Sequence, residues 1–160
     1  MRIYVCSPYR ADTPEGIEMN VAFARECCRA IFDAGHDPYA SHLLFPQFCD
    51  DGNDAEREKC MEAAKRELLL CDGVMAFGES WSEGMAQEVS FADSHGVPVH
   101  SSSRDGLGMH INNAILLFAA RCELFAYEQS RAHWERNPDR KPPSVSEWRL
   151  ARNFLWGDLP

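Results

Sequence analysis

Short apolar runs alternate with longer amphipathic stretches over the first hundred residues of the chain. The short runs are rich in β-forming residues and bounded by turn formers, which predicts buried strands. These strands are expected at residues 2–7, 37–41, 73–77 and 97–100. Between them apolar residues recur with helical period, and we expect helices after Asn20, after Asp54 and from Ser82. This alternation is typical of an α/β fold, a Rossmann- or flavodoxin-like parallel sheet of four to five strands flanked by helices.

Residues 101–160 follow a different pattern. A turn-rich connection leads to a long helical pattern from Asn112 to about Trp134, and a proline-containing break comes next. Ser144 and Glu147 fit a capping box that opens a last short helix rich in aromatic residues. We therefore expect an α/β domain at residues 1–100 and a helical extension at 101–160, which packs on that domain or on a partner subunit.

Composition narrows the classes of partner. The chain has 160 residues, 45% of them hydrophobic, and a formal net charge of −9. A charge of this sign argues against binding to a nucleic-acid polymer, although a small anionic ligand needs only a local group of donors. Seven cysteines without a CxxC motif favour reduced thiols and a cytoplasmic location, with no metal site and no cofactor predicted. No apolar stretch approaches the roughly 20 residues of a membrane span.

The expected start of the third helix carries the most informative residues. In a parallel α/β sheet, ligands bind beyond the carboxyl ends of the strands, close to the loops that follow them. Gly84 would let the backbone approach a ligand, and the first turn of a helix favours negative charge. Glu88 lies one turn further on, on the same face as Met85, and leans back toward the strand ends. Taken alone, Glu88 is better explained as an exposed helix glutamate.

A family resemblance adds weight to Glu88. The pattern of Ser82, Gly84 and Glu88, about 75 residues after Tyr4 in a first strand that leads into SPYR, resembles the nucleoside 2′-deoxyribosyltransferase superfamily. The resemblance covers roughly residues 1–100. It is strongest to a small-domain branch that includes 2′-deoxynucleoside 5′-monophosphate N-glycosidases and uncharacterised phage and bacterial proteins with HLLFPQF-like segments. It implies that Glu88 is a nucleophile at the sugar C1′ atom, that Tyr4 orients it, and that the protein forms a homodimer or higher homo-oligomer.

The predicted binding residues lie in the loops after the strands. Ser82 stands where transferases of this superfamily carry an aspartate and monophosphate hydrolases carry a serine, which favours a phosphorylated nucleoside; a plain helix cap is the alternative. Arg10 is expected to hold the phosphate, with Ser7 and Tyr9 in the same loop. His42 is expected to contact the base. Stacking on the base is expected of Phe45 and Phe48, which could equally be core residues.

One position departs from the family pattern. The superfamily carries an acid on the helix before the third strand, and Ala64 occupies that position here. Glu62 is the nearest acid, and we expect it to substitute as a catalytic residue. If it does not, the leaving base must be protonated by His42, Glu79, Glu83 or water.

Several functions remain open at this point. The leading one is hydrolysis of the N-glycosidic bond of a nucleoside 5′-monophosphate or a related nucleotide. Base exchange by a nucleoside 2′-deoxyribosyltransferase differs only in what intercepts the intermediate. A non-catalytic nucleotide-binding protein is the alternative that Ala64 favours. A flavin or phosphate binder of the flavodoxin type has less support, because no glycine-rich phosphate loop follows the first strand.

Overall fold

A computed structural model of the chain describes residues 1–78, 80–102 and 127. In these residues four strands form one sheet in the order β2-β1-β3-β4, and each neighbouring pair is parallel. The strands are β1 (Arg2–Cys6), β2 (Asp37–Tyr39), β3 (Gly73–Phe77) and β4 (Val99–Ser102). The helices are α1 (Pro14–Asp33), α2 (Ser41–Leu44), the 3-10 helix η1 (Phe45–Gln47), α3 (Asp54–Leu68) and α4 (Glu83–Ser94). The predicted parallel α/β sheet flanked by helices is confirmed.

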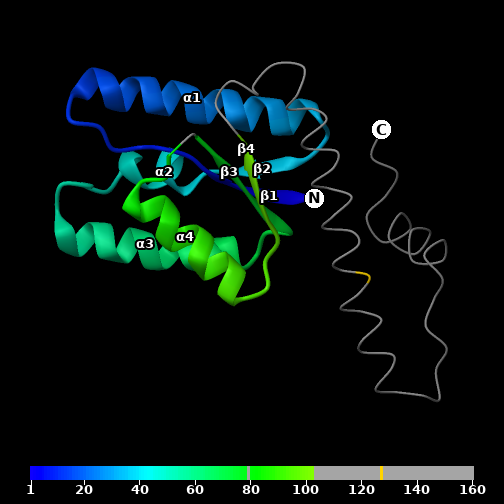
Figure 1. Ribbon diagram of the computed structural model, residues 1–160. Helices are drawn as coiled ribbons and strands as arrows, with labels where there is room; N and C mark the ends of the chain where they lie inside the picture. Colours follow the sequence, from blue (N-terminus) through cyan, green and yellow to red (C-terminus); the bar gives the residue numbers. More distant parts are fainter. Residues whose placement is uncertain (79, 103–126, 128–160) are drawn as a thin grey trace, which may run out of the picture. The chain divides into compact units, whose positions relative to one another are not determined.

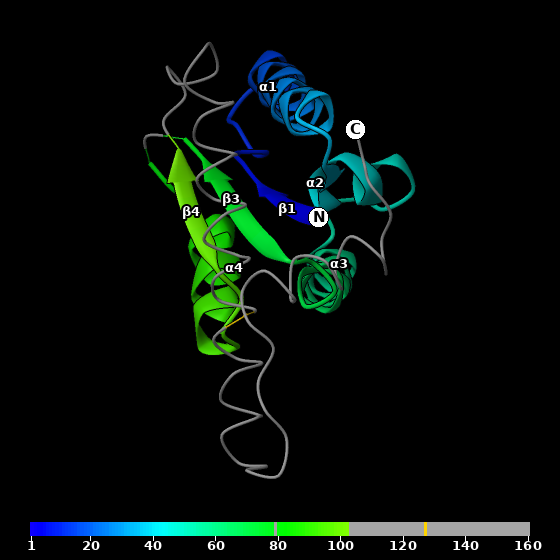
Figure 2. The same cartoon turned by 90° about the vertical axis from the view of Figure 1, so that its right-hand side faces the viewer.

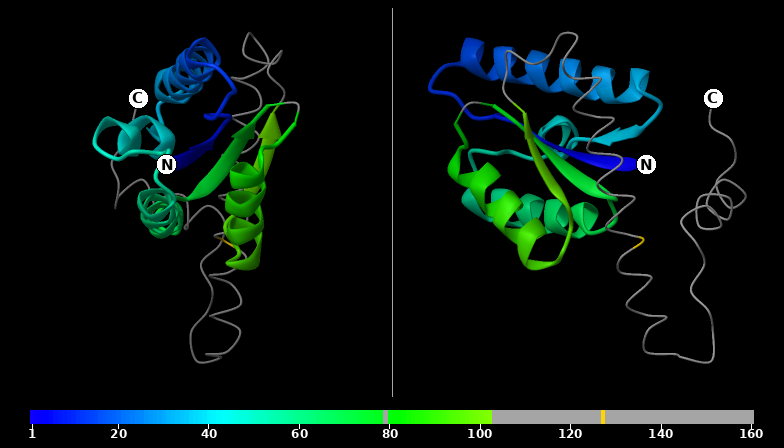
Figure 3. Two further views of the ribbon diagram at one scale, coloured as in Figure 1. Left: turned by 90° about the vertical axis from the view of Figure 1, so that its left-hand side faces the viewer. Right: turned by 45° about the vertical axis from the view of Figure 1, so that its right-hand side comes forward.

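Helices cover both faces of the sheet (Figure 1). Helix α1 lies along one face, whereas α3 and α4 lie side by side against the other, an arrangement that Figure 2 and Figure 3 show from further sides. This is the result expected of right-handed βαβ connections that run first toward β2 and then back across β1 to β3. Among the described residues, no helix is long and apolar enough to cross a membrane.

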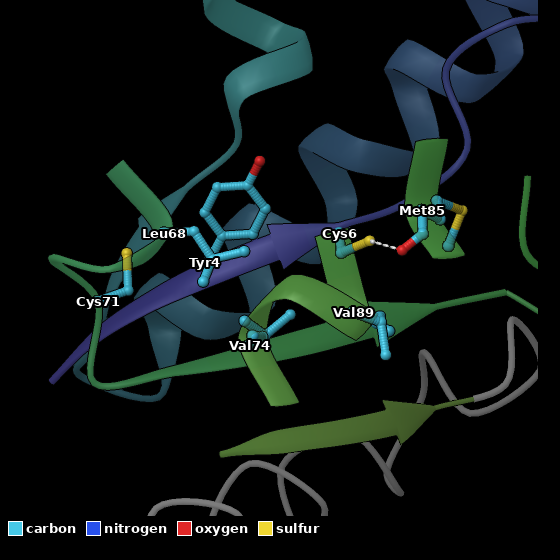
Figure 4. Packing of buried hydrophobic residues seen from close by; sticks show 9 residues of the cluster. Tyr4, Cys6, Leu68, Cys71, Val74, Met85 and Val89 are labelled. Carbon is cyan, nitrogen blue, oxygen red and sulfur yellow. Dashed lines mark hydrogen bonds between the residues drawn. The ribbon is translucent and has the colours of Figure 1, made fainter. Parts of the chain in front are cut away.

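The strands alternate their side chains between two apolar layers. Tyr4 pairs in register with Val74, and both face a buried cluster beneath α4 that includes Leu68 and Val89 (Figure 4). Ile3 alternates with Tyr4 and therefore faces the side of α1. All residues of β3 are buried, as expected for a strand inside a parallel sheet.

Helix α1 begins earlier than the apolar periodicity predicts. Thr13 is its N-cap and accepts a hydrogen bond from the Gly16 amide at 3.1 Å, and Pro14 occupies the first turn. The first turns are largely exposed, so they carry no apolar stripe that the sequence pattern could reveal. Asn20 does not cap the helix. Its side-chain amide donates to the carbonyl groups of Tyr9 and Arg10, at 3.1 and 3.3 Å, and so holds the first βα loop.

Other boundaries also differ from the expected ones. Part of the expected loop after β2 is helical, forming α2 and η1. The fourth strand is Val99–Ser102 instead of residues 97–100, because the Val97 amide bonds to the Ala92 carbonyl at 2.9 Å and completes the exit from α4. The predicted helical extension lies outside the described residues, apart from the end of β4 and Tyr127.

A glycine follows the end of α1. Gly35 has φ of 81°, a conformation that a side chain disfavours. We expect Gly35→Ala to lower the free energy of unfolding by about 1–2 kcal/mol, because alanine is strained at positive φ. Urea unfolding followed by circular dichroism measures the change. Gly84→Ala is the matched control, since residue 84 is helical and an added Cβ would lie 3.8 Å from its nearest neighbour. Equal stability of Gly35→Ala and wild type would contradict the expectation.

Candidate active site

A cavity of about 240 Å³ opens at the carboxyl ends of the strands. Its walls come from the segments that follow β1 and β2, from α3, and from the start of α4, which are the places where ligands bind in such sheets. The predicted residues that line it are Ser7, Tyr9, Arg10, His42, Phe45, Ser82, Gly84, Met85 and Glu88. The fold therefore brings together residues that are far apart in the sequence.

Glu88 is a buried carboxylate at this cavity. Only 7% of the residue is exposed, and its Oε1 atom accepts a hydrogen bond of 2.6 Å from the Tyr4 hydroxyl. The Tyr4 oxygen also lies 2.7 Å from the Ser41 hydroxyl. An ionised carboxylate can only accept, so Tyr4 donates to Glu88 and Ser41 donates to Tyr4. The three side chains form a hydrogen-bond chain that fixes the carboxylate from below.

Burial controls the protonation of Glu88 and Tyr4. Desolvation raises the pKa of Glu88 above its ordinary value, while the hydrogen bonds from Tyr4 and Cys6 lower it in part. Burial and the neighbouring Glu88 charge raise the pKa of Tyr4 well above its ordinary value, so Tyr4 keeps its proton and remains a donor. The carboxylate is therefore poorly solvated, and its stabilisation depends on a few fixed donors.

Ser7 and His42 form a second polar pair in the cavity wall. The Ser7 hydroxyl lies 2.8 Å from the His42 Nε2 atom, and the His42 ring is 6.3 Å from the ring of Tyr9. Burial lowers the pKa of His42 from 6.5 to about 4. At neutral pH the ring is therefore uncharged and can donate or accept a hydrogen bond, but it carries no spare proton.

The start of α4 forms part of the cavity wall. Ser82 is the N-cap of the helix, and its hydroxyl oxygen accepts from the Met85 amide at 3.3 Å. That bond uses the oxygen as acceptor, so the hydroxyl hydrogen can still donate to a ligand. Gly84 adds no side chain at this place. Met85 is buried and lies in the apolar cluster beneath the cavity.

Two arginines share one carboxylate at the same cavity. Arg10 Nε donates to Asp51 Oδ2 at 2.6 Å, and its Nη2 bonds to the Asp51 carbonyl oxygen. Arg57 Nη1 donates to Asp51 Oδ1 and Oδ2 at 3.1 and 3.2 Å. All three residues line the cavity. The predicted Arg10 is therefore at the site, but it is paired with a residue of the chain.

The structure does not bring Glu62 to the cavity. Its side chain is 56% exposed and pairs with Lys65 at 2.8 Å. The two neighbouring wall positions on α3 are Met61 and the buried Ala64. On a helix Glu62 points away from the face that carries Ala64, because residues two apart do not share a face. The expected substitution of Glu62 for the missing acid has no geometric basis in the structure.

The two phenylalanines of the second loop differ in position. Phe45 is partly buried and lines the cavity, where its ring can contact a base. Phe48 is 69% exposed and packs edge-on against Phe45, with the ring centroids 6.0 Å apart. Core packing therefore does not describe Phe48. Glu79, one of the alternative proton donors, lies outside the described residues.

Sequence reasoning missed Ser41, Asp51 and Arg57. Ser41 follows the end of β2 by two residues, and the pairing of Tyr4 with Tyr39 brings it beside the Tyr4 ring. The pairing of β1 with β2 is therefore the feature that indicates Ser41. No local pattern marks Asp51 or Arg57. Asp51 matters through its contact with Arg10, more than forty residues away, and Arg57 matters through its contact with Asp51.

The burial of Glu88 should make the stability of the protein depend on pH. Its folded-state pKa is raised, so its contribution to stability is complete below the ordinary glutamate pKa and is lost as the pH rises through the folded-state value. We expect Glu88→Gln to raise the free energy of unfolding by about 1 kcal/mol at pH 7, with a smaller gain at pH 4. Denaturant unfolding at both pH values measures this. The exposed Glu62→Gln serves as control, and a Glu88→Gln protein less stable than wild type at pH 7 would refute the prediction.

For His42 we expect stability to depend on pH in the opposite direction. Its folded-state pKa is depressed, so its contribution is complete above pH 6.5 and is lost as the pH falls toward about 4. The shift corresponds to up to about 3 kcal/mol. We expect His42→Asn to flatten the fall in unfolding free energy between pH 6.5 and 4, whereas the same change at the exposed His95 leaves the slope as in wild type. An unchanged slope in His42→Asn would show that the ring titrates normally.

Comparisons with known proteins place the chain in a family and give its fold a precedent. No curated protein matches the chain. A 2-deoxyribosyltransferase from the psychrotolerant bacterium Bacillus psychrosaccharolyticus has a similar structure, with a TM-score of 0.51 and 19% sequence identity over 64% of this chain and 72% of that chain. At this identity the likeness concerns the fold. The family model described as domain of unknown function DUF7768 matches residues 1–102, and the chain belongs to that family.

Proposed function

We propose that the protein cleaves the N-glycosidic bond of a nucleoside 5′-monophosphate or related nucleotide. The observation that carries this proposal is the buried Glu88 carboxylate, held by Tyr4 at the floor of a cavity. A fixed and poorly solvated carboxylate suits a reaction that builds positive charge on a sugar, because it can stabilise that charge or attack C1′. The likeness of the fold to a 2-deoxyribosyltransferase supports the same chemistry.

The proposed reaction has two steps. In the first, a Glu88 oxygen forms a bond to C1′ as the C1′–N bond breaks, and the electron pair of that bond leaves with the base, which takes up a proton. In the second, water attacks C1′, the ester bond to Glu88 breaks, and the water gives up one proton, so the products are the free base and the sugar phosphate. Tyr4 stays protonated throughout and keeps the unbonded carboxylate oxygen in place.

The start of α4 is suited to the phosphate group. The Ser82 hydroxyl is a donor, and the positive end of the helix dipole favours an anion. Arg10 and Arg57 add two guanidinium groups in the same cavity. A nucleoside without phosphate would leave these groups without a negative partner from the substrate.

The part of the cavity formed by Phe45, Ser7 and His42 is suited to the base. Phe45 offers a ring face, and the Ser7–His42 pair offers a hydrogen bond to a base edge. His42 is uncharged near neutral pH, and Ala64 supplies no acid. The remaining candidates for the proton of the leaving base are water, Glu79 and Glu83, which lines the cavity at the start of α4.

Two other functions have a specific observation in their favour. Base exchange has the structural likeness to a 2-deoxyribosyltransferase. A nucleotide-binding role without turnover is supported by Ala64, which places no carboxylate in a cavity that otherwise contains binding groups. In each case the partner is a small nucleoside or nucleotide. We also propose that the protein is cytoplasmic and forms a homodimer or higher homo-oligomer.

A panel of ribo- and deoxynucleosides and their 5′-monophosphates tests the proposal. We expect chromatography to show free base released from monophosphates, and Glu88→Ala to reduce the rate at least about a thousandfold because the nucleophile is lost. Tyr4→Phe should reduce it less. Mass spectrometry of acid-quenched protein should find a sugar-phosphate adduct on Glu88. The exposed Glu62→Gln is the matched control and should keep the wild-type rate.

The outcomes separate the candidate functions. Release of base by Glu88→Ala at the wild-type rate would disprove the assignment of the nucleophile. Product that forms only when a second free base is added identifies a transferase. Tight nucleotide binding with no product, in wild type and Glu88→Ala alike, identifies a binding protein.

A further inference from the structure

The cluster of Arg10, Asp51 and Arg57 is unusual because a single carboxylate serves two guanidinium groups. Both oxygens of Asp51 accept from Arg57, and one also accepts from Arg10 at 2.6 Å. We propose that Asp51 is an internal counter-ion for these arginines, and that the phosphate of the substrate displaces it. The proposal rests on the proposed function for the identity of the substrate, but the displacement can be tested with phosphate alone.

Arg57 is directed toward the start of α4. Its Nη1 atom bonds to Asp51, while its Nη2 atom lies 3.8 Å from the position that a Cβ on Gly84 would take. The Ser82 hydroxyl oxygen is 4.0 Å from the same position. The Arg57 guanidinium and the Ser82 hydroxyl thus both lie close to Gly84 at the start of α4. Arg57 is therefore the residue that connects the arginine cluster to the helix donors.

A phosphate group can replace Asp51 in its ion pairs with Arg10 and Arg57. The side chains of Asp51 and Arg57 are each 29% exposed and that of Arg10 is 50% exposed, so water and salt weaken their attraction. A phosphate group carries a charge of about −1.5 to −2 and three acceptor oxygens, against one charge and two oxygens for a carboxylate. Arginine binds such a group through two parallel hydrogen bonds. The exchange therefore favours phosphate over Asp51.

The backbone around Asp51 is held by other residues. Asp50 accepts from the Gly52 amide at 2.9 Å, and Asn53 caps α3 by accepting from the amides of Ala55 and Glu56. These local bonds fix the turn before α3. The Asp51 side chain can consequently leave the arginines without unfolding the turn, and a neutral residue at this position should fold normally.

Displacement has a distinctive consequence for binding. A residue that merely orients the two arginines would help phosphate to bind, so its loss would weaken binding. A residue that competes with phosphate has the opposite effect, and its loss strengthens binding. The sign of the change at Asp51 therefore separates the two roles.

Isothermal titration of the full chain with inorganic phosphate, at low ionic strength, tests the proposal. We expect Asp51→Asn to bind phosphate about three- to tenfold more tightly than wild type, and Arg57→Met to bind at least about tenfold more weakly. Asp51→Ser repeats the first measurement with a shorter side chain. Arg29→Met and Asp33→Asn are matched controls, because Arg29 and Asp33 form an exposed ion pair on α1, and both should bind like wild type.

Two results of the phosphate titration would overturn the inference, and the release of base tests the proposed function separately. Weaker phosphate binding by both Asp51 variants would make Asp51 an orienting residue, and undetectable binding by wild type would remove the site. If base is released from nucleosides as fast as from monophosphates, the displacement plays no part in selecting the substrate. If phosphate binds as expected but no base is ever released, the proposed hydrolysis fails while the anion site stands.

Discussion

The hydrogen bond between Tyr4 and Glu88 is the constraint on which the site depends. It joins the central strand β1 to helix α4 in the interior, where a carboxylate would otherwise lose its solvation without replacement. Because α4 packs on β1 and β3, the position of the carboxylate follows from the packing of the sheet and not from a loop. The Ser41 hydroxyl extends the chain of donors to the start of α2. One short polar chain thus ties three elements together directly beneath the cavity.

Most of the fold could be predicted from the sequence, because the strands are short apolar runs and the helices have recognisable ends. Gly35 and Gly96 end α1 and α4 at positive φ, as their positions after apolar periodicity indicate. The beginning of α1 was missed because Thr13 and Pro14 start a helix whose first turns carry no apolar stripe. The helical turns after β2 were missed because four or three residues are too few to show a period.

The candidate site was predictable where the relevant residues belong to local motifs. Ser82 caps α4, and Gly84 and Glu88 lie in its first two turns, so their common location follows from the helix alone. The role of Tyr4 was implied by the family resemblance, and its place on an inner strand of the sheet brings it to Glu88. Asp51 and Arg57 could not be predicted, since their contacts depend on how the loop before α3 folds over Arg10. Glu62 does not reach the cavity because residues two apart on a helix, such as Glu62 and Ala64, do not share a face.

The burial of Glu88 has a consequence for descent within the family. A chain that keeps a charged group in its interior gives up stability that an amide or an apolar side chain would restore. Mutation would therefore remove the carboxylate readily in any lineage that no longer needs it, and selection on folding would favour the loss. The residue at this position would therefore distinguish relatives that carry out the proposed reaction from relatives that have kept the scaffold for another purpose.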